Sequence, residues 1–308
     1  MMNKISRKHD FLIKPGMKIT GKWHNHTYVI KKKLGSGAIG TVYLCETKGS
    51  YAALKISDKS ASMTTEVNVL KSLGKVQGNR LGPSLLDVDD WINPIGQKYT
   101  FYVMEYIKGE AVRPFIQQNG NEWIGVFMLQ LLDDLEKLHK SGWVFGDLKL
   151  ENLLITASPT RIRWIDVGGT TLIGRAIKEY TEFYDRGYWG LGSRRAEPSY
   201  DLFAFVMVIL SIYYPHKFHR ENPSQTTTTT TIFKKIDAIK TLTPYSICLK
   251  KAITGKYETS AQMKQAIQTV LYQAEKNHQE ITNQKPFLME SVGILFVAGG
   301  YYFISLLL

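Results

Sequence analysis

A glycine-rich loop between two β-rich segments is the feature that most restricts how this chain can fold. In "TYVIKKKLGSGAIGTVYLCETKGSYAALKIS", residues 27–57, the pattern predicts strands over 28–34, 41–45 and 51–56. A G-x-G-x-x-G loop that binds a dinucleotide has to open a helix. Here the glycines are followed by "TVYLCE", which is a β-type sequence. The dinucleotide-binding fold is therefore excluded, and a small, mainly β lobe is expected.

The chain after residue 108 predicts helices. In "NEWIGVFMLQLLDDLEKLHKSG" apolar residues recur every three or four positions, and Gly142 is typical of a helix end. The segment "LFAFVMVILSIYY", residues 202–214, is apolar on every side but too short to cross a bilayer, so it predicts a central core helix. The threonine run in residues 222–231 predicts a mobile loop. Further helices are expected over 232–240, 244–254 and 260–273.

The net charge of +12 is concentrated at the N-terminus. Residues 1–33 contain nine basic residues and one acidic residue, which leaves +8 of that charge in this segment. Such a cluster could meet DNA, anionic lipid or an acidic partner, or could be only a solvated face. The two cysteines, Cys45 and Cys248, lie far apart and favour a reducing, cytosolic setting. The N-terminus has no signal-peptide pattern.

The C-terminal stretch "SVGILFVAGGYYFISLLL", residues 291–308, carries no charge. As a helix it would be about 27 Å long, close to the roughly 30 Å of a bilayer core. A globular helix seldom lacks a polar face over its whole length. We therefore expect a tail-anchored protein with a single transmembrane helix in the cell membrane and its basic body in the cytoplasm.

The polar motifs occur in the order that phosphoryl transfer from a nucleotide requires. Gly35, Gly37 and Gly40 would let the backbone approach phosphates, with Val42 covering the base and Lys55, two positions after Ala53, holding the phosphates. In "WVFGDLKLENLLI", residues 143–155, the polar residues suggest three roles. Asp147 could accept the proton of an acceptor hydroxyl, Lys149 could neutralise charge, and Asn152 could bind a metal ion. Asp166, in "RWIDVGGT", is the second expected metal ligand.

With these motifs the chain resembles the bacterial eukaryotic-like (Hanks-type) serine/threonine protein kinases, and in particular the short, C-terminally membrane-anchored YabT-type kinases. The resemblance extends from about residue 27 to residue 273. It implies an α+β, bilobal protein-kinase fold that holds ATP with Mg²⁺, or alternatively Mn²⁺, between a β-rich N-lobe and a larger helical C-lobe. The expected organisation is a basic segment (1–26), N-lobe (27–108), C-lobe (109–273), polar linker (274–290) and transmembrane helix (291–308).

The resemblance also implies roles for single residues. Lys55 would pair with Glu66, Met104 would be the gatekeeper, and residues 105–107 would form the adenine-binding hinge. Asp201 would brace the catalytic loop, and Leu70, Phe145 and Val167 would form an apolar column. The complete nucleotide-binding set that it implies is Leu34, Gly35, Ser36, Gly37, Gly40, Val42, Ala53, Lys55, Glu66, Met104, Glu105 and Ile107.

The chain departs from the family at Gly146 and in the activation segment. Gly146 replaces the arginine that usually receives an activation-segment phosphate, so we expect activity that does not depend strongly on such a phosphate. "AEP", residues 196–198, lies too close to Asp201 to match the family's Ala-Pro-Glu. We place Thr181 next to the substrate instead, with Asp185 replacing the glutamate and pairing with Lys256.

Other functions remain open from the sequence. "GDL" also resembles the catalytic loop of small-molecule phosphotransferases, so a sugar or lipid kinase is one alternative, and a catalytically weak DNA- or lipid-binding scaffold is another. For a protein kinase, we expect protein substrates including the enzyme itself, and a homodimer as one regulated state. The pairs His24/His26 and His216/His219 have no third ligand nearby in the sequence, which favours loop or surface histidines over a metal site.

Overall fold

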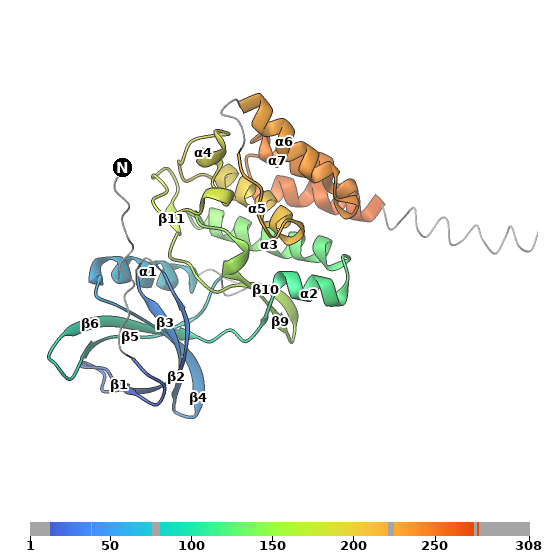
Figure 1. Ribbon diagram of the computed structural model, residues 1–308. Helices are drawn as coiled ribbons and strands as arrows, with labels where there is room; N and C mark the ends of the chain where they lie inside the picture. The colour runs from blue at the N-terminus through green and yellow to red at the C-terminus, as the bar shows by residue number, and fades with distance from the viewer. Residues whose placement is uncertain (1–12, 38, 76–80, 221–224, 274–275, 277–308) are drawn as a thin grey trace, which may run out of the picture.

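The computed structural model describes residues 13–37, 39–75, 81–220, 225–273 and 276. These form a β-rich N-lobe and a larger helical C-lobe (Figure 1). The N-lobe contains β1 Lys18–Thr20, β2 Thr27–Ser36, β3 Thr41–Thr47, β4 Ser50–Ser57, α1 Ser60–Leu73, β5 Leu85–Ile92 and β6 Lys98–Glu105. The expected two-lobed architecture is confirmed, and the three strands around the glycine loop lie where the β-type segments predicted them.

The N-lobe sheet has the strand order β1-β2-β3-β4-β6-β5, with antiparallel neighbours. Although β1 and β5 stand at opposite ends of this order, the turn after β1 reaches β5. The amide of Lys22 donates to the carbonyl oxygen of Asp90 at 2.8 Å. The sheet is therefore curled until its two ends meet, around buried residues such as Ile30, Leu54 and Phe101.

The C-lobe is built around one apolar helix. Its elements are β7 Glu110–Ala111, α2 Val112–Asn119, α3 Trp123–Lys140, β8 Trp143–Val144, η1 Leu150–Asn152, β9 Leu153–Ala157, β10 Thr160–Trp164, β11 Thr171–Leu172, η2 Glu182–Tyr184, α4 Arg186–Trp189, α5 Pro198–Tyr213, α6 Gln225–Asp237, η3 Lys240–Tyr245 and α7 Ser246–Ile253. A further helix covers residues 260–273. Helix α5 is buried on all sides from Tyr200 to Ile212, which confirms the predicted core helix.

The prediction of a mobile loop over residues 222–231 is wrong for residues 225–231, which form the first part of α6. Thr228, Ile232 and Ile236 recur every four residues and are all buried. Helix α6 also contacts α7. Burial of this apolar stripe outweighs the weak helix propensity of the threonines, whose effect is only a few tenths of a kcal/mol per residue.

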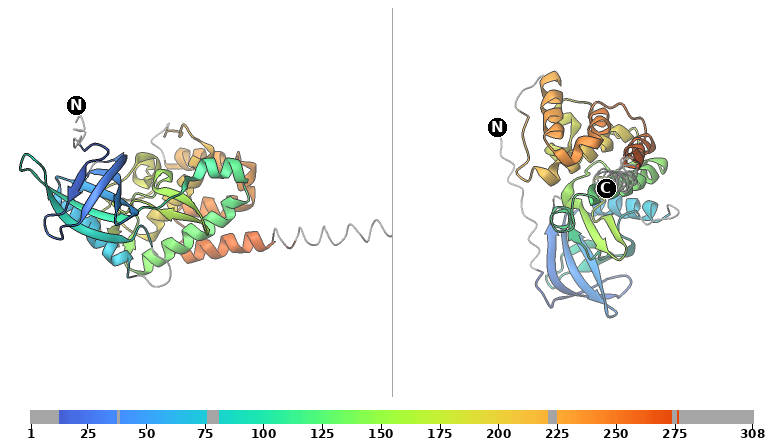
Figure 2. Two further views of the ribbon diagram at one scale, coloured as in Figure 1. Left: turned by 90° about the horizontal axis from the view of Figure 1, so that it is seen from below. Right: turned by 90° about the vertical axis from the view of Figure 1, so that its right-hand side faces the viewer.

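The expected membrane span, residues 291–308, lies outside the described residues, as do residues 1–12 of the basic segment. Within the part of the chain that the structure describes, no helix combines the length and the apolar character needed to cross a bilayer. The last described helix, residues 260–273, runs along α3 and ends on the side of the C-lobe that is remote from the N-lobe sheet (Figure 2).

Candidate functional site

The glycine loop connects β2 to β3 at one edge of the space between the lobes. The amide of Gly37 donates to the carbonyl oxygen of Gly40 at 2.9 Å, which closes the turn. A Cβ atom added to Gly40 would lie 2.4 Å from the carbonyl oxygen of Ile56, so packing requires glycine there. A Cβ atom on Gly35 or Gly37 would meet none of the described atoms within 4 Å. These two positions leave the backbone open to a ligand.

Lys55 on β4 and Glu66 on α1 form the predicted ion pair. Lys55 Nζ lies 2.9 Å from Glu66 Oε1 and 2.7 Å from Oε2, and Tyr102 Oη donates to Oε2 at 2.7 Å. Burial opposes the charge on the ammonium group, but the carboxylates of Asp166 and Glu66 outweigh this effect and raise the pKa of Lys55. Asp166 Oδ1 is 3.9 Å from Nζ. Lys55 is therefore held as a cation that faces Asp166.

The apolar residues predicted to contact adenine lie on the N-lobe strands and just after β6. Ala53 on β4 pairs with Met104 on β6 across the sheet, and both are buried in the main apolar cluster. Val42 packs against the same cluster, and Ile107, just after β6, is also buried. Leu34, on β2, is partly exposed. The predicted set therefore combines a buried apolar floor with an accessible apolar residue near the glycine loop.

The side chain of Glu105, predicted only as part of the hinge, is held by an arginine that the sequence reasoning missed. Arg163 Nη1 on β10 donates to Glu105 Oε1 at 2.7 Å, and Arg163 Nη2 donates to the carbonyl oxygen of Gly82 at 2.9 Å. Ser84 donates to Glu105 Oε2 through its amide and its hydroxyl, each at 3.2 Å. These contacts tie the hinge to a C-lobe strand. Alternation in "RIRW" places Arg163 on the face opposite the buried Ile162 and Trp164, so no local pattern indicated this contact.

Asp147 and Lys149 of the catalytic loop and Thr181 of the activation segment come together in the C-lobe. Lys149 Nζ donates to Asp147 Oδ2, and Thr181 Oγ1 donates to Asp147 Oδ1 at 3.0 Å. Thr181 is 34 residues further along the chain, so the activation segment closes over the catalytic loop. Each carboxylate oxygen keeps a second lone pair. Asp147 is thus oriented from both sides while it can still accept a proton.

Asn152 and Asp166 provide oxygen donors of the kind that Mg²⁺ prefers. Asn152 Nδ2 donates to the carbonyl oxygen of Asp147 at 3.1 Å, which commits the nitrogen end of this amide. The amide of Ile165 donates to the carbonyl oxygen of Asn152 at 3.0 Å, so the strand that leads to Asp166 is tied to Asn152. About half of the Asp166 side chain is exposed. One amide oxygen and one accessible carboxylate fit the expected ion.

The catalytic loop is braced by Asp201 on α5, as predicted. Asp201 is fully buried and accepts hydrogen bonds from the amides of Phe145, at 2.7 Å, and Gly146, at 3.0 Å. His139 Nε2 on α3 lies 2.9 Å from the same carboxylate. Leu70, Phe145 and Val167 are all buried in the main apolar cluster, and their stacking as a column stays a prediction. The loop is therefore held from α3 and α5 as well as through its own turns.

The backbone conformation at position 146 requires glycine, in addition to the loss of the arginine that is usual in the family. Its φ is +80°, in the left-handed region that favours glycine. A Cβ atom at this position would lie 2.4 Å from the carbonyl oxygen of Gly169. The close approach of the two glycines joins the catalytic loop to the segment after Asp166. This contact involves no side chain, so the motif alone does not reveal it.

The predicted pair between Asp185 and Lys256 is wrong. Asp185 Oδ2 accepts from Arg194 Nε at 2.8 Å, and Oδ1 accepts from Tyr200 Oη at 3.0 Å. The same carboxylate caps α4 through the amides of Gly187 and Tyr188. Lys256 is exposed in the turn after α7. Arg194, nine residues away in sequence, therefore forms the ion pair with Asp185 that was predicted for Lys256.

We expect Asp185→Ala to lower the free energy of unfolding by about 2–3 kcal/mol. The change removes a helix cap and leaves the buried Tyr200 hydroxyl without its acceptor. Lys256→Ala is the matched control and should change stability by less than about 0.5 kcal/mol. Urea unfolding followed by tryptophan fluorescence measures both. Equal losses in the two variants would restore Lys256 as a partner of Asp185.

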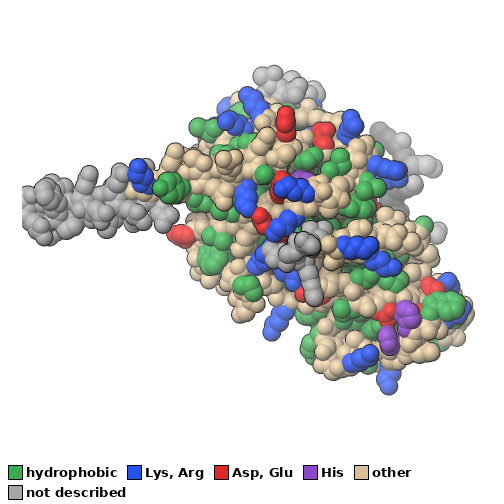
Figure 3. Space-filling view, turned by 180° about the vertical axis from the view of Figure 1, so that it is seen from behind, with side chains coloured by type: hydrophobic (Ala, Val, Ile, Leu, Met, Phe, Trp, Pro, Cys, Tyr) green, Lys and Arg blue, Asp and Glu red, His purple; other side chains and the backbone are tan. Residues whose placement is uncertain are grey.

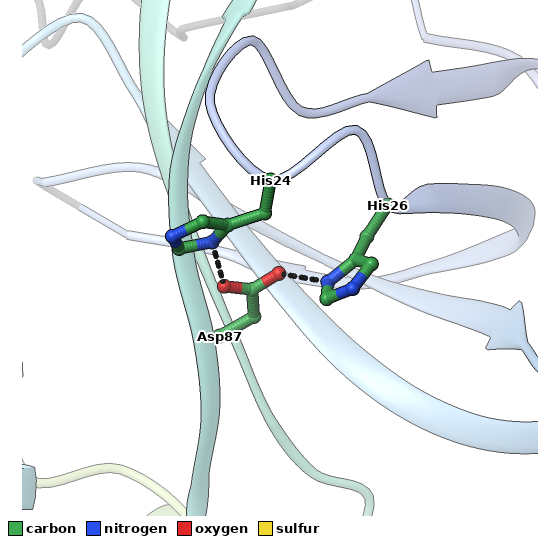
Figure 4. A group of neighbouring side chains, drawn as sticks. All are labelled: His24, His26 and Asp87. Atoms are coloured by element: carbon green, nitrogen blue, oxygen red, sulfur yellow. Dashed lines mark hydrogen bonds and ion pairs between the residues drawn. The ribbon is translucent and has the colours of Figure 1, made fainter.

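The two N-terminal histidines lie apart from this site and are exposed between β1 and β2, as predicted for loop or surface histidines, but a third potential ligand that is distant in sequence lies beside them. Asp87, on β5, joins His24 and His26 (Figure 4). It is 61 residues from His26 in sequence, so inspection of neighbouring residues could not find it. His216 and His219 are both exposed, as predicted for surface histidines.

Comparison with known proteins agrees with the site. Residues 28–285 match the protein kinase domain family. The chain is 49% identical over 265 residues to the serine/threonine-protein kinase YabT of Bacillus subtilis. The matched region covers 86% of this chain and 77% of that protein. It is 29% identical over 209 residues to the sporulation protein kinase mde3 of Schizosaccharomyces pombe, over 60% of this chain and 37% of the relative.

Proposed function

The chain belongs to the protein kinase family and is a serine/threonine protein kinase, and on this premise we propose that it phosphorylates cytosolic proteins, and itself, from a membrane surface. The observation that carries the catalytic part is the junction of Asp147, Lys149 and Thr181 beside the ion pair of Lys55 and Glu66. The small-molecule kinase and the scaffold are less well supported, because the relatives reported above are named as protein kinases.

The site residues divide the work of phosphoryl transfer. Bound Mg-ATP supplies the phosphoryl group, and Asn152 and Asp166 would hold its metal ion. Asp147 orients the acceptor hydroxyl and accepts its proton as the new oxygen–phosphorus bond forms and the bond to the leaving diphosphate breaks. Lys55 binds the phosphates, and Lys149 neutralises charge on the moving group. Catalysis in this scheme is mainly positioning and charge stabilisation.

A cavity beside Thr181 supports a polypeptide as the acceptor. Its volume is about 270 Å³, and its lining includes Phe183, Tyr188, Lys217 and Phe218. An aromatic recess next to the residue that contacts Asp147 can receive a side chain that neighbours the acceptor serine or threonine. A free sugar would leave this surface unused. We therefore propose proteins as the main substrates.

The membrane location is proposed from the sequence of residues 291–308 together with the position of the last described helix. The 18 residues of this stretch are uncharged. The helix of residues 260–273 ends on the side of the C-lobe that is remote from the N-lobe (Figure 2). An anchor that follows this helix would leave the site between the lobes free to meet cytosolic proteins.

Exposed lysines of β1 and β2 support a regulatory surface that binds phosphate groups. Lys18 lies on β1, Lys22 follows it, and Lys31, Lys32 and Lys33 lie on β2; all five are exposed. Phosphates of DNA and of anionic lipids share the chemistry that this surface fits. Binding of several copies of the protein to the same DNA or lipid membrane would also favour a homodimer. We propose that this surface regulates the kinase.

The test is transfer of labelled γ-phosphate from Mg-ATP by the full chain in detergent. Acceptors are the enzyme itself, a generic protein, a free sugar and a lipid, each with and without duplex DNA or anionic vesicles. We expect protein acceptors to be labelled preferentially, with stimulation by one of the two polyanions that weakens as salt is raised. Preferred labelling of sugar or lipid would overturn the substrate assignment. Equal rates with and without duplex DNA, and with and without anionic vesicles, would overturn the regulatory surface.

A further inference from the structure

A compact group of metal-ligand side chains lies on the N-lobe, outside the kinase site. His24 and His26 stand on the turn between β1 and β2, and Asp87 projects from β5 between them (Figure 4). His24 Nδ1 is 2.7 Å from Asp87 Oδ1, and His26 Nδ1 is 2.9 Å from Asp87 Oδ2. One ligand atom from each residue lies within 4.8 Å of the other two. We propose that these three residues bind a divalent transition-metal ion, of which Zn²⁺ is the best match.

The donor set selects the class of ion. Two imidazole nitrogens and one carboxylate suit Zn²⁺ and its neighbours in the transition series, whereas Mg²⁺ prefers oxygen ligands alone. Tetrahedral Zn²⁺ bonds of about 2 Å separate its ligand atoms by roughly 3.3 Å. The nitrogen–oxygen distances of 2.7 and 2.9 Å, which join the two histidines to different oxygens of Asp87, need to open by about half an ångström. The three ligand atoms now lie within 4.8 Å of one another, so the widest pair needs to close by at most about 1.5 Å. Water can occupy the remaining position.

The backbone of the turn directs both histidines to the same side. Asn25, between them, has a φ of +56°, a left-handed conformation that asparagine adopts more readily than most residues. Asp89 accepts hydrogen bonds from the amides of Trp23, at 2.9 Å, and His24, at 2.8 Å. Asp89 is almost fully buried. The turn is thus held in place without using the three ligand side chains.

Asp87 is also prepared to act as a ligand. Tyr28 Oη donates to Asp87 Oδ2 at 2.5 Å, and the amide of Val88 donates to Oδ1 at 2.8 Å. Both oxygens of the Asp87 carboxylate are therefore oriented by groups that are not themselves proposed ligands. Hydrogen bonds of this kind orient metal ligands in known sites.

The site is accessible, and it has a structural consequence. The side chains of His24 and His26 are 53% and 44% exposed, and histidine side chains lie at the surface beside acidic ones in Figure 3. The turn and β5 belong to opposite ends of the sheet order. Metal–ligand bonds would join the turn before β2 to β5 and so resist separation of the two ends of the sheet. Metal binding should therefore raise the melting temperature of the N-lobe.

The experiment uses the full chain in detergent, purified without a polyhistidine tag, stripped with a chelator and equilibrated with Zn²⁺. Bound zinc is measured by atomic emission after gel filtration, and affinity by isothermal titration. We expect one site-specific equivalent in the unmodified protein and at least tenfold weaker binding in the double variant His24→Asn/His26→Asn. The matched control His216→Asn/His219→Asn should bind like the unmodified protein. When Mg²⁺ is added in place of Zn²⁺, we expect no metal ion to remain bound at this site after gel filtration.

Two further measurements separate metal binding from the hydrogen-bonded pairs seen between the histidines and Asp87. Zn²⁺ should raise the melting temperature of the unmodified protein and of the control, but not of the His24/His26 double variant. Asp87→Asn keeps the size of the side chain and should also lose zinc, and melting without metal shows whether each variant is folded. If the unmodified protein retains no zinc, or if folded His24/His26 and control variants retain equal amounts, the proposal is wrong.

Discussion

Asp147→Asn should reduce phosphoryl transfer by about 10²–10⁴-fold, the range associated with loss of a positioned general base. Asparagine has the same shape, so it can still accept a hydrogen bond from Thr181 or Lys149. Its neutral amide cannot accept the proton of an acceptor hydroxyl or balance the charge of Lys149. ATP binding should persist, because the glycine loop and the ion pair of Lys55 and Glu66 lie elsewhere.

The measurement is the initial rate of label transfer from γ-labelled Mg-ATP to a generic protein, together with ATP affinity by titration. Asp133→Asn is the matched control. Its carboxylate lies on α3 and pairs with Lys137 and Lys264, away from the catalytic loop. We expect the control to stay within about twofold of the unmodified enzyme, as usual for a surface ion pair of small energy. A rate within tenfold for Asp147→Asn, with ATP still bound, would remove Asp147 from its catalytic role.

Gly146→Ala should destabilise the protein by about 2 kcal/mol more than Gly142→Ala, which is its matched control. Both glycines lie next to or in the catalytic loop with similar positive φ, +80° and +86°. Each substitution therefore includes the same cost of a left-handed alanine, about 1–2 kcal/mol. A Cβ atom on Gly142 would meet none of the described atoms within 4 Å, whereas one on Gly146 would meet the carbonyl oxygen of Gly169 at 2.4 Å. The difference isolates this contact.

Urea unfolding measures the free energy of unfolding of both variants, and the phosphoryl-transfer assay measures their catalytic rates. Relief of the contact has to move Gly169 or the neighbouring Asp147, so we expect turnover to fall in Gly146→Ala and to stay near normal in Gly142→Ala. Gly146→Arg, which introduces the residue usual in the family, should carry the same penalty. Equal stability losses at positions 146 and 142 would show that the backbone can adjust freely. The chain would then lack the arginine for reasons unrelated to packing.

The sequence alone was sufficient for features that depend on local pattern. The β-type segments on either side of the glycine-rich loop predicted the strands there, and the uniformly apolar segment predicted α5, because each signal lies within a few consecutive residues. The order of Lys55, Asp147, Asn152 and Asp166 pointed to phosphoryl transfer, since this chemistry requires those residue types. The resemblance to kinases added the pairing of Lys55 with Glu66 and the bracing role of Asp201, both of which the structure confirms.

The tertiary structure decided every contact for which several residues of the right charge or size were available. Asp185 pairs with Arg194 instead of Lys256, because a lysine in the turn after α7 remains exposed. The threonine-rich segment is helical because its buried stripe packs in the C-lobe. Arg163 holds Glu105 and Asp87 joins His24 and His26 because strands distant in sequence meet in space. Composition and spacing identify the residues that can interact, but the free energy of packing selects which of them do.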